Sequence, residues 1–215
     1  MSKVTVDVGM SLDGFIAGPN AGPQNALGDG GHRIHQWVYD LEAWRERQSL
    51  RGGQTNRDDE VLREAYEHVG AFIMGRRMFD EGEIGWPDPP PFQAPVFVLT
   101  NHGREPWIRG GGTTFTFVTD GIESALEQAR EAAGETDVGI SGGANTIDQF
   151  AKAGLVDEVQ FHLAPVILGR GVKLFETVGE EGLDLEKVRL VDSPGVTHIS
   201  FRVAKQGTYS DSQKH

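Results

Sequence analysis

The sequence predicts an α/β fold in which a mixed β-sheet carries helices on its faces and ends in an antiparallel hairpin. Strand and helix patterns alternate through the middle of the chain, and strand patterns alone finish it. Alternation favours parallel strands joined by crossover helices, whereas the final strands are close enough in sequence to pair antiparallel. The 215 residues suit a single domain over residues 1–205, followed by a flexible tail over 206–215 that lacks apolar periodicity.

The N-terminal part predicts a strand and then a long polar segment. Val4, Val6 and Val8 alternate with polar residues, which is the pattern of a strand. Residues 20–57 are rich in Gly, Asn and Gln around one short helix over 34–47. This segment is therefore the candidate for a loop or lid that closes over a substrate.

Helix and strand patterns then alternate. A helix begins at Asp58, whose side chain can cap it, and precedes a buried strand over 71–74. Gly75 ends that strand, and Arg76 opens another short helix. The β-branched and aromatic run over 95–100 predicts a further buried strand.

The C-terminal half is richer in strands, which are predicted at residues 113–118, 137–141, 158–168, 185–191 and 197–203. Asp120 and Glu123 have the spacing of a capping box at the start of a helix that Gly134 ends. Pro165 breaks the third of these strands. The last two strands form the closing antiparallel hairpin.

The composition excludes several classes of function. The chain has 20 basic and 32 acidic residues, a net charge of −12, so it repels nucleic acid and anionic membranes. It has no cysteine, which excludes disulfides and thiolate zinc sites, and His32 and His35 have no third ligand nearby in sequence. No apolar run is long enough to span a membrane. We expect a soluble cytoplasmic protein with no bound metal and no nucleic-acid or membrane partner.

Three junctions between a strand and the segment after it carry groups that suit a phosphate, and they lie at residues 75–77, 100–104 and 141–146. The carboxyl ends of neighbouring parallel strands share one edge of a sheet, which is where ligands bind in open α/β folds. Gly142 and Gly143 can turn tightly and let a helix N-terminus offer free N–H groups to an anion. Each junction alone also fits an ordinary helix start. Neither a P-loop nor a GxGxxG motif after the first strand is present.

Five segments in order resemble dihydrofolate-reductase-like proteins: SLDGFIA, FIMGRRMFD, PVFVLTN, ISGGANTIDQF and VDEVQFHLAPVILGRGVKLFE. The resemblance covers Val4 to Val203 and is closest to the riboflavin-pathway reductase domain, the C-terminal half of the bifunctional deaminase–reductase. It implies a twisted mixed sheet flanked by helices and NADPH as the cofactor.

The resemblance also implies cofactor-binding residues. Those near the adenosine 2′-phosphate and the pyrophosphate are Gly75, Arg76 and Arg77, and Thr100 and Asn101 match a segment that touches the adenine ribose phosphate. Apart from the resemblance, Arg104 after the 95–100 strand is a further cation available to the 2′-phosphate. The pyrophosphate turn corresponds to Ser141, Gly142, Gly143, Ala144, Asn145 and Thr146. Ala17 would border the nicotinamide ring.

The proton donor has several candidates. Asp59 lies 16 positions before Gly75, where folate reductases carry a carboxylate, but it also fits an ordinary acidic first helical turn (75 − 59 = 16). Asp13 fits either a substrate contact or an Asp-Gly turn. Water is the third alternative.

We therefore expect an NADPH-dependent reductase that transfers a hydride to a small heterocyclic or sugar-linked substrate. It resembles 5-amino-6-(5-phosphoribosylamino)uracil reductase of riboflavin biosynthesis. One alternative is dihydrofolate reductase proper, although residues 20–57 differ from its substrate loop. Another is a non-catalytic module that binds NADPH or a related nucleotide. An exposed strand at the hairpin end of the sheet leads us to expect a homodimer.

Overall fold

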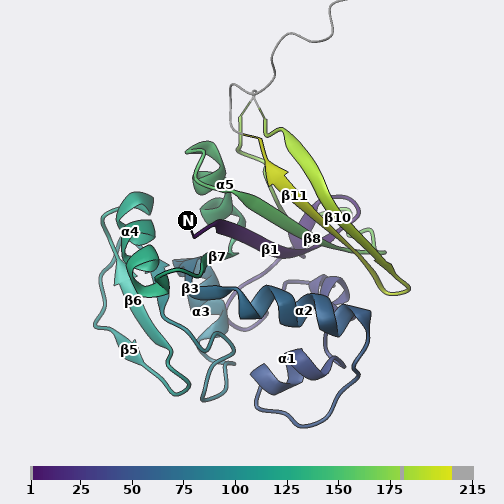
Figure 1. The fold of residues 1–215 in the computed structure, drawn as a ribbon, viewed down its shortest axis with the longest axis horizontal. Coiled ribbons are helices and arrows are strands. Elements are labelled where there is room, and N and C mark those ends of the chain that lie inside the picture. The colour runs from purple at the N-terminus through teal and green to yellow at the C-terminus, as the bar shows by residue number, and fades with distance from the viewer. Residues whose placement is uncertain (1, 180–181, 205–215) are drawn as a thin grey trace, which may run out of the picture.

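A computed structural model describes residues 2–179 and 182–204 and contains, within those ranges, a nine-stranded sheet and a two-stranded sheet (Figure 1). The large sheet has the order β10-β11-β8-β1-β7-β3-β4-β6-β5. Its strands are β1 (Val4–Ser11), β3 (Val69–Gly75), β4 (Val96–Leu99), β5 (Trp107–Ile108), β6 (Thr114–Val118), β7 (Asp137–Gly142), β8 (Glu158–Ala164), β10 (Leu185–Ser193) and β11 (Val196–Val203). The small sheet pairs β2 (Phe15–Ala17) with β9 (Val172–Lys173).

The pairing of the strands confirms the predicted α/β class. The strands from β8 through β1, β7, β3 and β4 to β6 are parallel to their neighbours. At the C-terminal end, β11 pairs antiparallel with β8, and β10 pairs antiparallel with β11. The strand pattern over 158–168 ends at Ala164, one residue before Pro165, because proline cannot donate to the ladder. The antiparallel hairpin therefore lies where the sequence predicts it.

Helices cover both faces of this sheet. They are the short 3₁₀ helix η1 (Gly31–His35) and the α-helices α1 (Glu42–Arg47), α2 (Arg57–Glu67), α3 (Arg76–Gly82), α4 (Ile122–Ala133) and α5 (Ala144–Lys152). Strand residues alternate between the two faces: Phe97 packs in the core under α4 and α5, whereas Val96 and Val98 pack with Phe79 of α3. A smaller apolar cluster around Leu41 and Leu62 joins α1 to α2. The sheet is thus buried on both sides, as parallel strands require.

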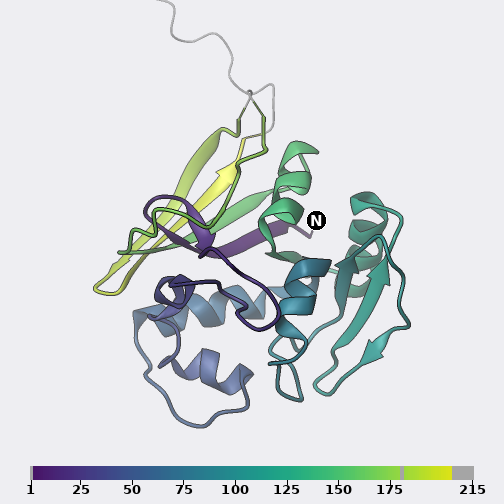
Figure 2. The same cartoon turned by 180° about the vertical axis from the view of Figure 1, so that it is seen from behind.

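Residues 20–57 differ from their predicted structure. The single helix expected over 34–47 is divided into η1 and α1, because Leu41 is extended and forms a bridge with Gln54. Figure 2 shows the purple segment after β2 extending toward α3, where the Arg77 guanidinium donates a hydrogen bond to the carbonyl of Ala21. This contact ties the segment to the edge of the sheet from which α3 starts.

Two predicted helix caps are wrong. Helix α2 is capped by Asn56 and not by Asp58, because the Asn56 side-chain oxygen accepts from the N–H groups of Asp58 and Asp59. Gly121 begins α4 without a side-chain cap, so Asp120 forms no capping box. Gly134 does end α4, with a positive φ of 62°.

None of the helices in the described ranges combines the length and apolar character needed to cross a membrane. The tail predicted for 206–215 lies outside the described residues.

Candidate functional site

A cavity of about 890 Å³ opens at the carboxyl ends of β3, β4 and β7. These three strands are parallel neighbours in the sheet, so their ends share one edge. The volume lies near the upper end of the usual range for ligand sites, about 300–1,000 Å³. The cavity brings together the predicted cofactor-binding residues other than Arg104, and it is lined by Ala17, Gly75, Arg76, Arg77, Thr100, Asn101, Ser141, Gly142, Gly143, Ala144, Asn145 and Thr146.

The turn from β7 into α5 leaves backbone exposed to this cavity. Gly142 has a φ of 128°, which side-chain-bearing residues rarely adopt. Gly143 is the N-cap of α5, no side chain caps that helix, and a Cβ added at Gly143 would meet no atom within 4 Å. The N–H of Thr146 already donates to the carbonyl of Gly143, but those of Ala144 and Asn145 keep the capacity to donate to an anion, and the cavity leaves room for it. This geometry fits a diphosphate held against the helix N-terminus.

Gly75 is required for a different reason. A Cβ at Gly75 would lie 2.4 Å from the Thr146 hydroxyl, so the end of β3 and the first turn of α5 contact each other directly. This close packing brings the arginines after Gly75 next to the glycine turn.

Two arginines at the start of α3 supply positive charge to the cavity. Arg76 Nε donates to Asp80 at 2.7 Å, and Arg77 Nε donates to Glu81 at 2.8 Å. The described hydrogen bonds of Arg76 use only Nε, so its terminal nitrogens are available to a phosphate.

Arg104, the third predicted cation, does not line the cavity. It pairs with Glu83 and lies over the ring of Phe117 among other aromatic rings. Its contacts belong to the aromatic core beside α3.

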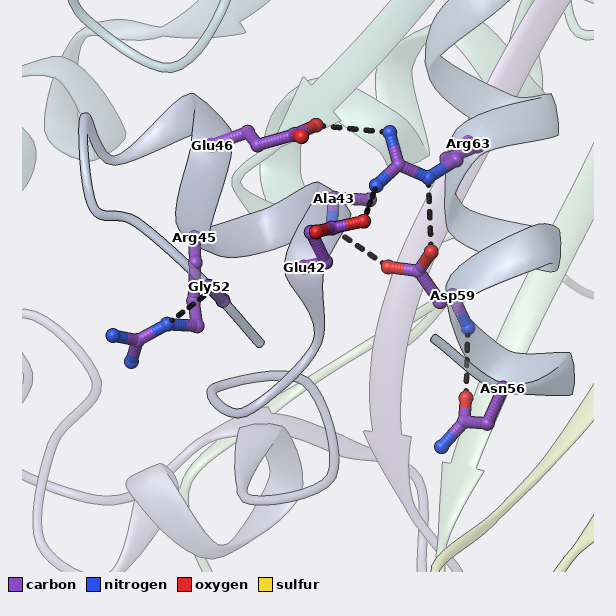
Figure 3. Close-up of polar contacts among 8 residues, drawn as sticks. All are labelled: Glu42, Ala43, Arg45, Glu46, Gly52, Asn56, Asp59 and Arg63. Carbon is purple, nitrogen blue, oxygen red and sulfur yellow. Dashed lines mark hydrogen bonds and ion pairs between the residues drawn. The ribbon is translucent and has the colours of Figure 1, made fainter. Parts of the chain in front are cut away.

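Asp59, a candidate acid, holds two helices together (Figure 3). Its side chain is buried, and its two oxygens accept from the N–H of Ala43 at 2.7 Å and from Nε of Arg63 at 2.9 Å. The same guanidinium also binds Glu42 and Glu46 on α1. Asp59 is not among the described residues that line the cavity. These contacts favour the interpretation of Asp59 as a residue of the helix start.

Asp13, the other candidate acid, fixes the loop that contains Leu168 and Gly169. Its carboxylate accepts from the Ser11 hydroxyl and from the N–H groups of Leu168 and Gly169. The hydrogen bond from Ser11, followed by those from the backbone, lowers the pKa of Asp13 to about 2. The carboxylate of Asp13 is therefore an ionised acceptor near neutral pH. Asp13 is not among the described residues that line the cavity.

The cavity has a second wall that the sequence reasoning missed. His35 of η1 lines the cavity beside Val8, Gly9 and Ile16, and no hydrogen bond to the His35 ring occurs within the described residues. No sequence pattern marks this position, because η1 belongs to a loop remote from the strand ends.

The rim of the cavity was missed for the same reason. Asp148 of α5 lines it and accepts from the backbone N–H groups of Phe175 and Thr177, which fixes the 175–177 segment there. Within the described ranges, no group of three or more His, Asp or Glu side chains is arranged to hold a metal ion.

The fold and this cavity define a class of protein. A large mixed sheet flanked by helices, with an antiparallel strand pair at one end, is the fold that this chain shares with dihydrofolate-reductase-like structures. The model of the RibD C-terminal domain matches residues 2–197, and the chain belongs to that family.

Solved structures share the fold over nearly the whole chain. A protein assigned to riboflavin biosynthesis from Shewanella sp. PV-4 has a TM-score of 0.65 at 23% identity, covering 94% of this chain and 99% of the other. Dihydrofolate reductase from Enterococcus faecalis, solved with NADP(H), has a TM-score of 0.54 at 14% identity, covering 94% and 97%. The deaminase/5-amino-6-(5-phosphoribosylamino)uracil reductase from Thermotoga maritima has a TM-score of 0.59 at 13% identity, covering 94% of this chain and 57% of the other.

Two curated proteins of Bacillus subtilis (strain 168) are similar in sequence. YyaP is 24% identical over 202 residues, which is 93% of this chain and 94% of YyaP. YwjB is 25% identical over 121 residues, and the match spans 54% of this chain and 64% of YwjB. Both relatives are uncharacterized, so the similarity assigns no substrate.

Proposed function

We propose that the protein is an NADPH-dependent reductase that transfers a hydride to a small heterocyclic or sugar-linked substrate, in the manner of 5-amino-6-(5-phosphoribosylamino)uracil reductase. The observation that carries the proposal is the convergence of an uncapped helix N-terminus, a bare glycine turn and two arginines on one cavity. Each of these features favours a phosphate group, and a dinucleotide has several.

The lining residues suggest how NADPH would lie. The N-terminus of α5 after Gly143 would hold the diphosphate, and Arg76 and Arg77 would bind the 2′-phosphate with charge-assisted hydrogen bonds. Thr100 and Asn101, which follow β4, would contact the adenosine ribose.

The nicotinamide would lie at the other end of the cavity. Ala17 on β2 would border the ring, next to Ile16 and Val8, where an apolar wall excludes water.

Bound NADPH would supply a hydride to the carbon of a C=N or C=O group, and the nitrogen or oxygen of that group would gain the electron pair. The protein then has to orient the two reactants, and one proton must reach the substrate. Asp59 and Asp13 both use their carboxylate oxygens in contacts away from the cavity lining. We therefore propose water as the source of the proton.

The comparisons support this function at the level of the family. The chain belongs to the RibD C-terminal domain family, and the Thermotoga maritima protein of the same fold carries the uracil reductase in its name. The Enterococcus faecalis enzyme of the same fold was solved with NADP(H). These likenesses favour an oxidoreductase, and the choice of substrate is our own proposal.

A direct test starts from the purified protein. The mass of any nucleotide that copurifies, together with titration by NADPH and NADH, measures cofactor binding. NADPH oxidation is then followed with the riboflavin-pathway pyrimidine and with a dihydropterin. Oxidation with the pyrimidine supports the proposal, and oxidation with the dihydropterin alone indicates a folate reductase. Tight NADPH binding with no turnover on either compound indicates a non-catalytic nucleotide-binding module, and no binding of either cofactor refutes the proposal.

We further propose that the protein acts in the cytoplasm as a homodimer. β10 lies at the edge of the sheet and exposes Leu185, Val188 and Leu190, whose exposed fractions are 37%, 54% and 55%. Apolar side chains on an unpaired edge strand favour pairing with a second copy. Light scattering at working concentration tests this proposal, and a monomeric mass contradicts it.

A further inference from the structure

Four side chains form a chain of hydrogen bonds across the sheet, in which the two histidines are buried and Asp7 at one end is partly open to solvent. His162 Nε2 lies 2.6 Å from Asp7 Oδ1, His162 Nδ1 lies 2.5 Å from His198 Nδ1, and His198 Nε2 lies 3.0 Å from Asp58 Oδ1. The two histidines are directly opposite each other on β8 and β11, and their exposed fractions are 3% and 2%. Asp7 comes from β1 and Asp58 from α2, so the chain joins three strands and a helix.

The three contacts of this chain set the number of hydrogens that the two histidines must carry. The chain has three contacts, and each needs one hydrogen between its two heavy atoms. Two neutral imidazoles carry one N–H each, and ionised carboxylates carry none, so only two contacts would be satisfied. If each neutral ring donated to its carboxylate, the two Nδ1 lone pairs would face each other at 2.5 Å. If both rings were cationic, two N–H groups would collide in the same place. One added proton satisfies all three contacts.

The geometry places that proton on His162. The contact to Asp7 is shorter than the contact from His198 to Asp58, as expected for an ion pair. Partial burial acts to raise the pKa of Asp7, but the charge and the hydrogen bond of His162 lower it below its ordinary value. Burial and the charge of His162 lower the pKa of His198, which keeps that ring neutral. The ring of Trp37 lies 4.9 Å from the His162 ring between centroids, within reach of a cation–π contact.

We propose that Asp7, His162, His198 and Asp58 form a site, with both histidines buried, that binds one excess proton, carried by His162 as an imidazolium. In this state His162 donates to Asp7 and to His198, and His198 donates to Asp58. The site then holds two carboxylates and one cation, and each of the three contacts along the chain has one hydrogen. The inference concerns the resting protein and does not depend on the proposed reductase activity.

The bound proton has a consequence for the cavity. Burial and then the charge of His162 lower the pKa of His35 to about 4, so the imidazole on the cavity wall is neutral at neutral pH. A neutral His35 can donate one hydrogen bond and accept one. This end of the cavity therefore suits an uncharged polar group, such as the carbonyl or N–H edge of a heterocycle, and the arginine end suits phosphate.

Nuclear magnetic resonance of the full chain, labelled with ¹⁵N in histidine, tests the proposal at neutral pH, because imidazole nitrogens with and without a proton have different shifts. The wild type is expected to show three N-bound protons in the His162–His198 pair, two of them on His162. Asp58→Asn is expected to show two, since the amide can donate to His198 Nε2 and every contact is then satisfied without the added proton. The His35 pKa should rise in this variant.

Asp7→Asn is a second, independent variant with the same expected count, because the introduced amide would donate to His162 Nε2 while its oxygen still accepts from Gln160. If one variant fails to fold, the other still decides the question. Asp192→Asn is the matched control, since this exposed carboxylate on β10 binds Thr197 and touches neither ring, and it should leave three protons. Two protons in the wild type, or three in a folded Asp58→Asn or Asp7→Asn protein, would overturn the proposal.

Discussion

The imidazole of His35 lies over Gly9, in the space that the side chain of any other residue at that position of β1 would occupy. A Cβ added to Gly9 would be 2.8 Å from His35 Cε1 and 3.2 Å from Cγ2 of Ile34. Gly9 is also opposite His162 in the parallel pairing of β1 and β8. The glycine thus lets η1 rest directly on the sheet and sets the wall of the cavity.

Gly9→Ala should displace η1 and lower the stability of the protein. Overpacking of a well-packed site usually costs about 1–3 kcal/mol, and denaturant unfolding measures the loss. Gly22→Ala is the control, because a Cβ at Gly22 meets no atom within 4 Å, and its stability should stay near that of the wild type. Equal stability of Gly9→Ala and wild type would show that η1 moves aside without cost.

Gly143→Val should abolish NADPH binding while the protein remains folded. The position has a φ of −75° and open space around its Cβ, so the added side chain enters the region proposed for the diphosphate. Cofactor titration and thermal unfolding of the same preparation check the two halves of this prediction. An unfolded variant whose remaining folded fraction still binds NADPH would mean that the turn is structural.

Arg76→Glu should weaken NADPH far more than NADH. A hydrogen bond to a charged group contributes about 1.5–3 kcal/mol, or roughly a 10- to 150-fold change in affinity, and only NADPH has the 2′-phosphate. Parallel titrations with both cofactors give the ratio. Arg130→Glu is the control. Arg130 is an exposed residue of α4 outside the cavity lining, so this variant makes the same change of charge and should leave the ratio unaltered. Equal affinity of the wild type for the two cofactors would rule out this assignment of Arg76.

Asp59→Asn should lower stability and leave both NADPH affinity and turnover nearly unchanged. The amide oxygen can still accept from Ala43, but the ionic bond from Arg63 is lost, which typically costs about 1–3 kcal/mol. Unfolding in denaturant and steady-state rates are compared for the two proteins. A rate loss of about 10²–10⁴-fold at unchanged stability would instead identify Asp59 as a general acid.

The contribution of Asp13 to stability should depend on pH. Its folded pKa, about 2, is below the ordinary value of 3.8, so its stabilising effect is present above the ordinary value and is lost as pH falls toward 2. The melting temperatures of wild type and Asp13→Asn should differ above pH 4 and converge toward pH 2. A constant difference across this range would show that the hydrogen bonds do not depend on the charge.

The parallel core of the sheet could be predicted because each strand there is a short, continuous apolar run followed by glycine or polar residues. Residues 71–74 and 95–100 both show this pattern, and both became buried parallel strands. The edge they share could then be inferred from the rule for the carboxyl ends of parallel strands. The predicted glycines, Arg76 and Arg77 do lie on one cavity at this edge, whereas Arg104 lies outside its lining.

The rest depended on contacts that have no local pattern. His162 and His198 are 36 residues apart, and only the register of β8 against β11 brings their rings together. The cap of α2 could not be chosen from the residue types, since Asn56, Asp58 and Asp59 are all good N-cap residues. In the structure the helix begins after Asn56, whose extended backbone makes it the cap. The carboxylates of Asp13 and Asp59 have the right spacing for a site, yet their oxygens are used by backbone N–H groups.

The contact between Gly75 and Thr146 also constrains how the sequence can change over evolutionary time. A methyl group at position 75 would lie 2.4 Å from the Thr146 hydroxyl, so neither position is free to vary without regard to the other. A side chain at 75 would require the Thr146 side chain to rotate or to be replaced by a smaller one. The two positions are therefore coupled, and a change at 75 is easiest in a sequence whose position 146 no longer carries the hydroxyl.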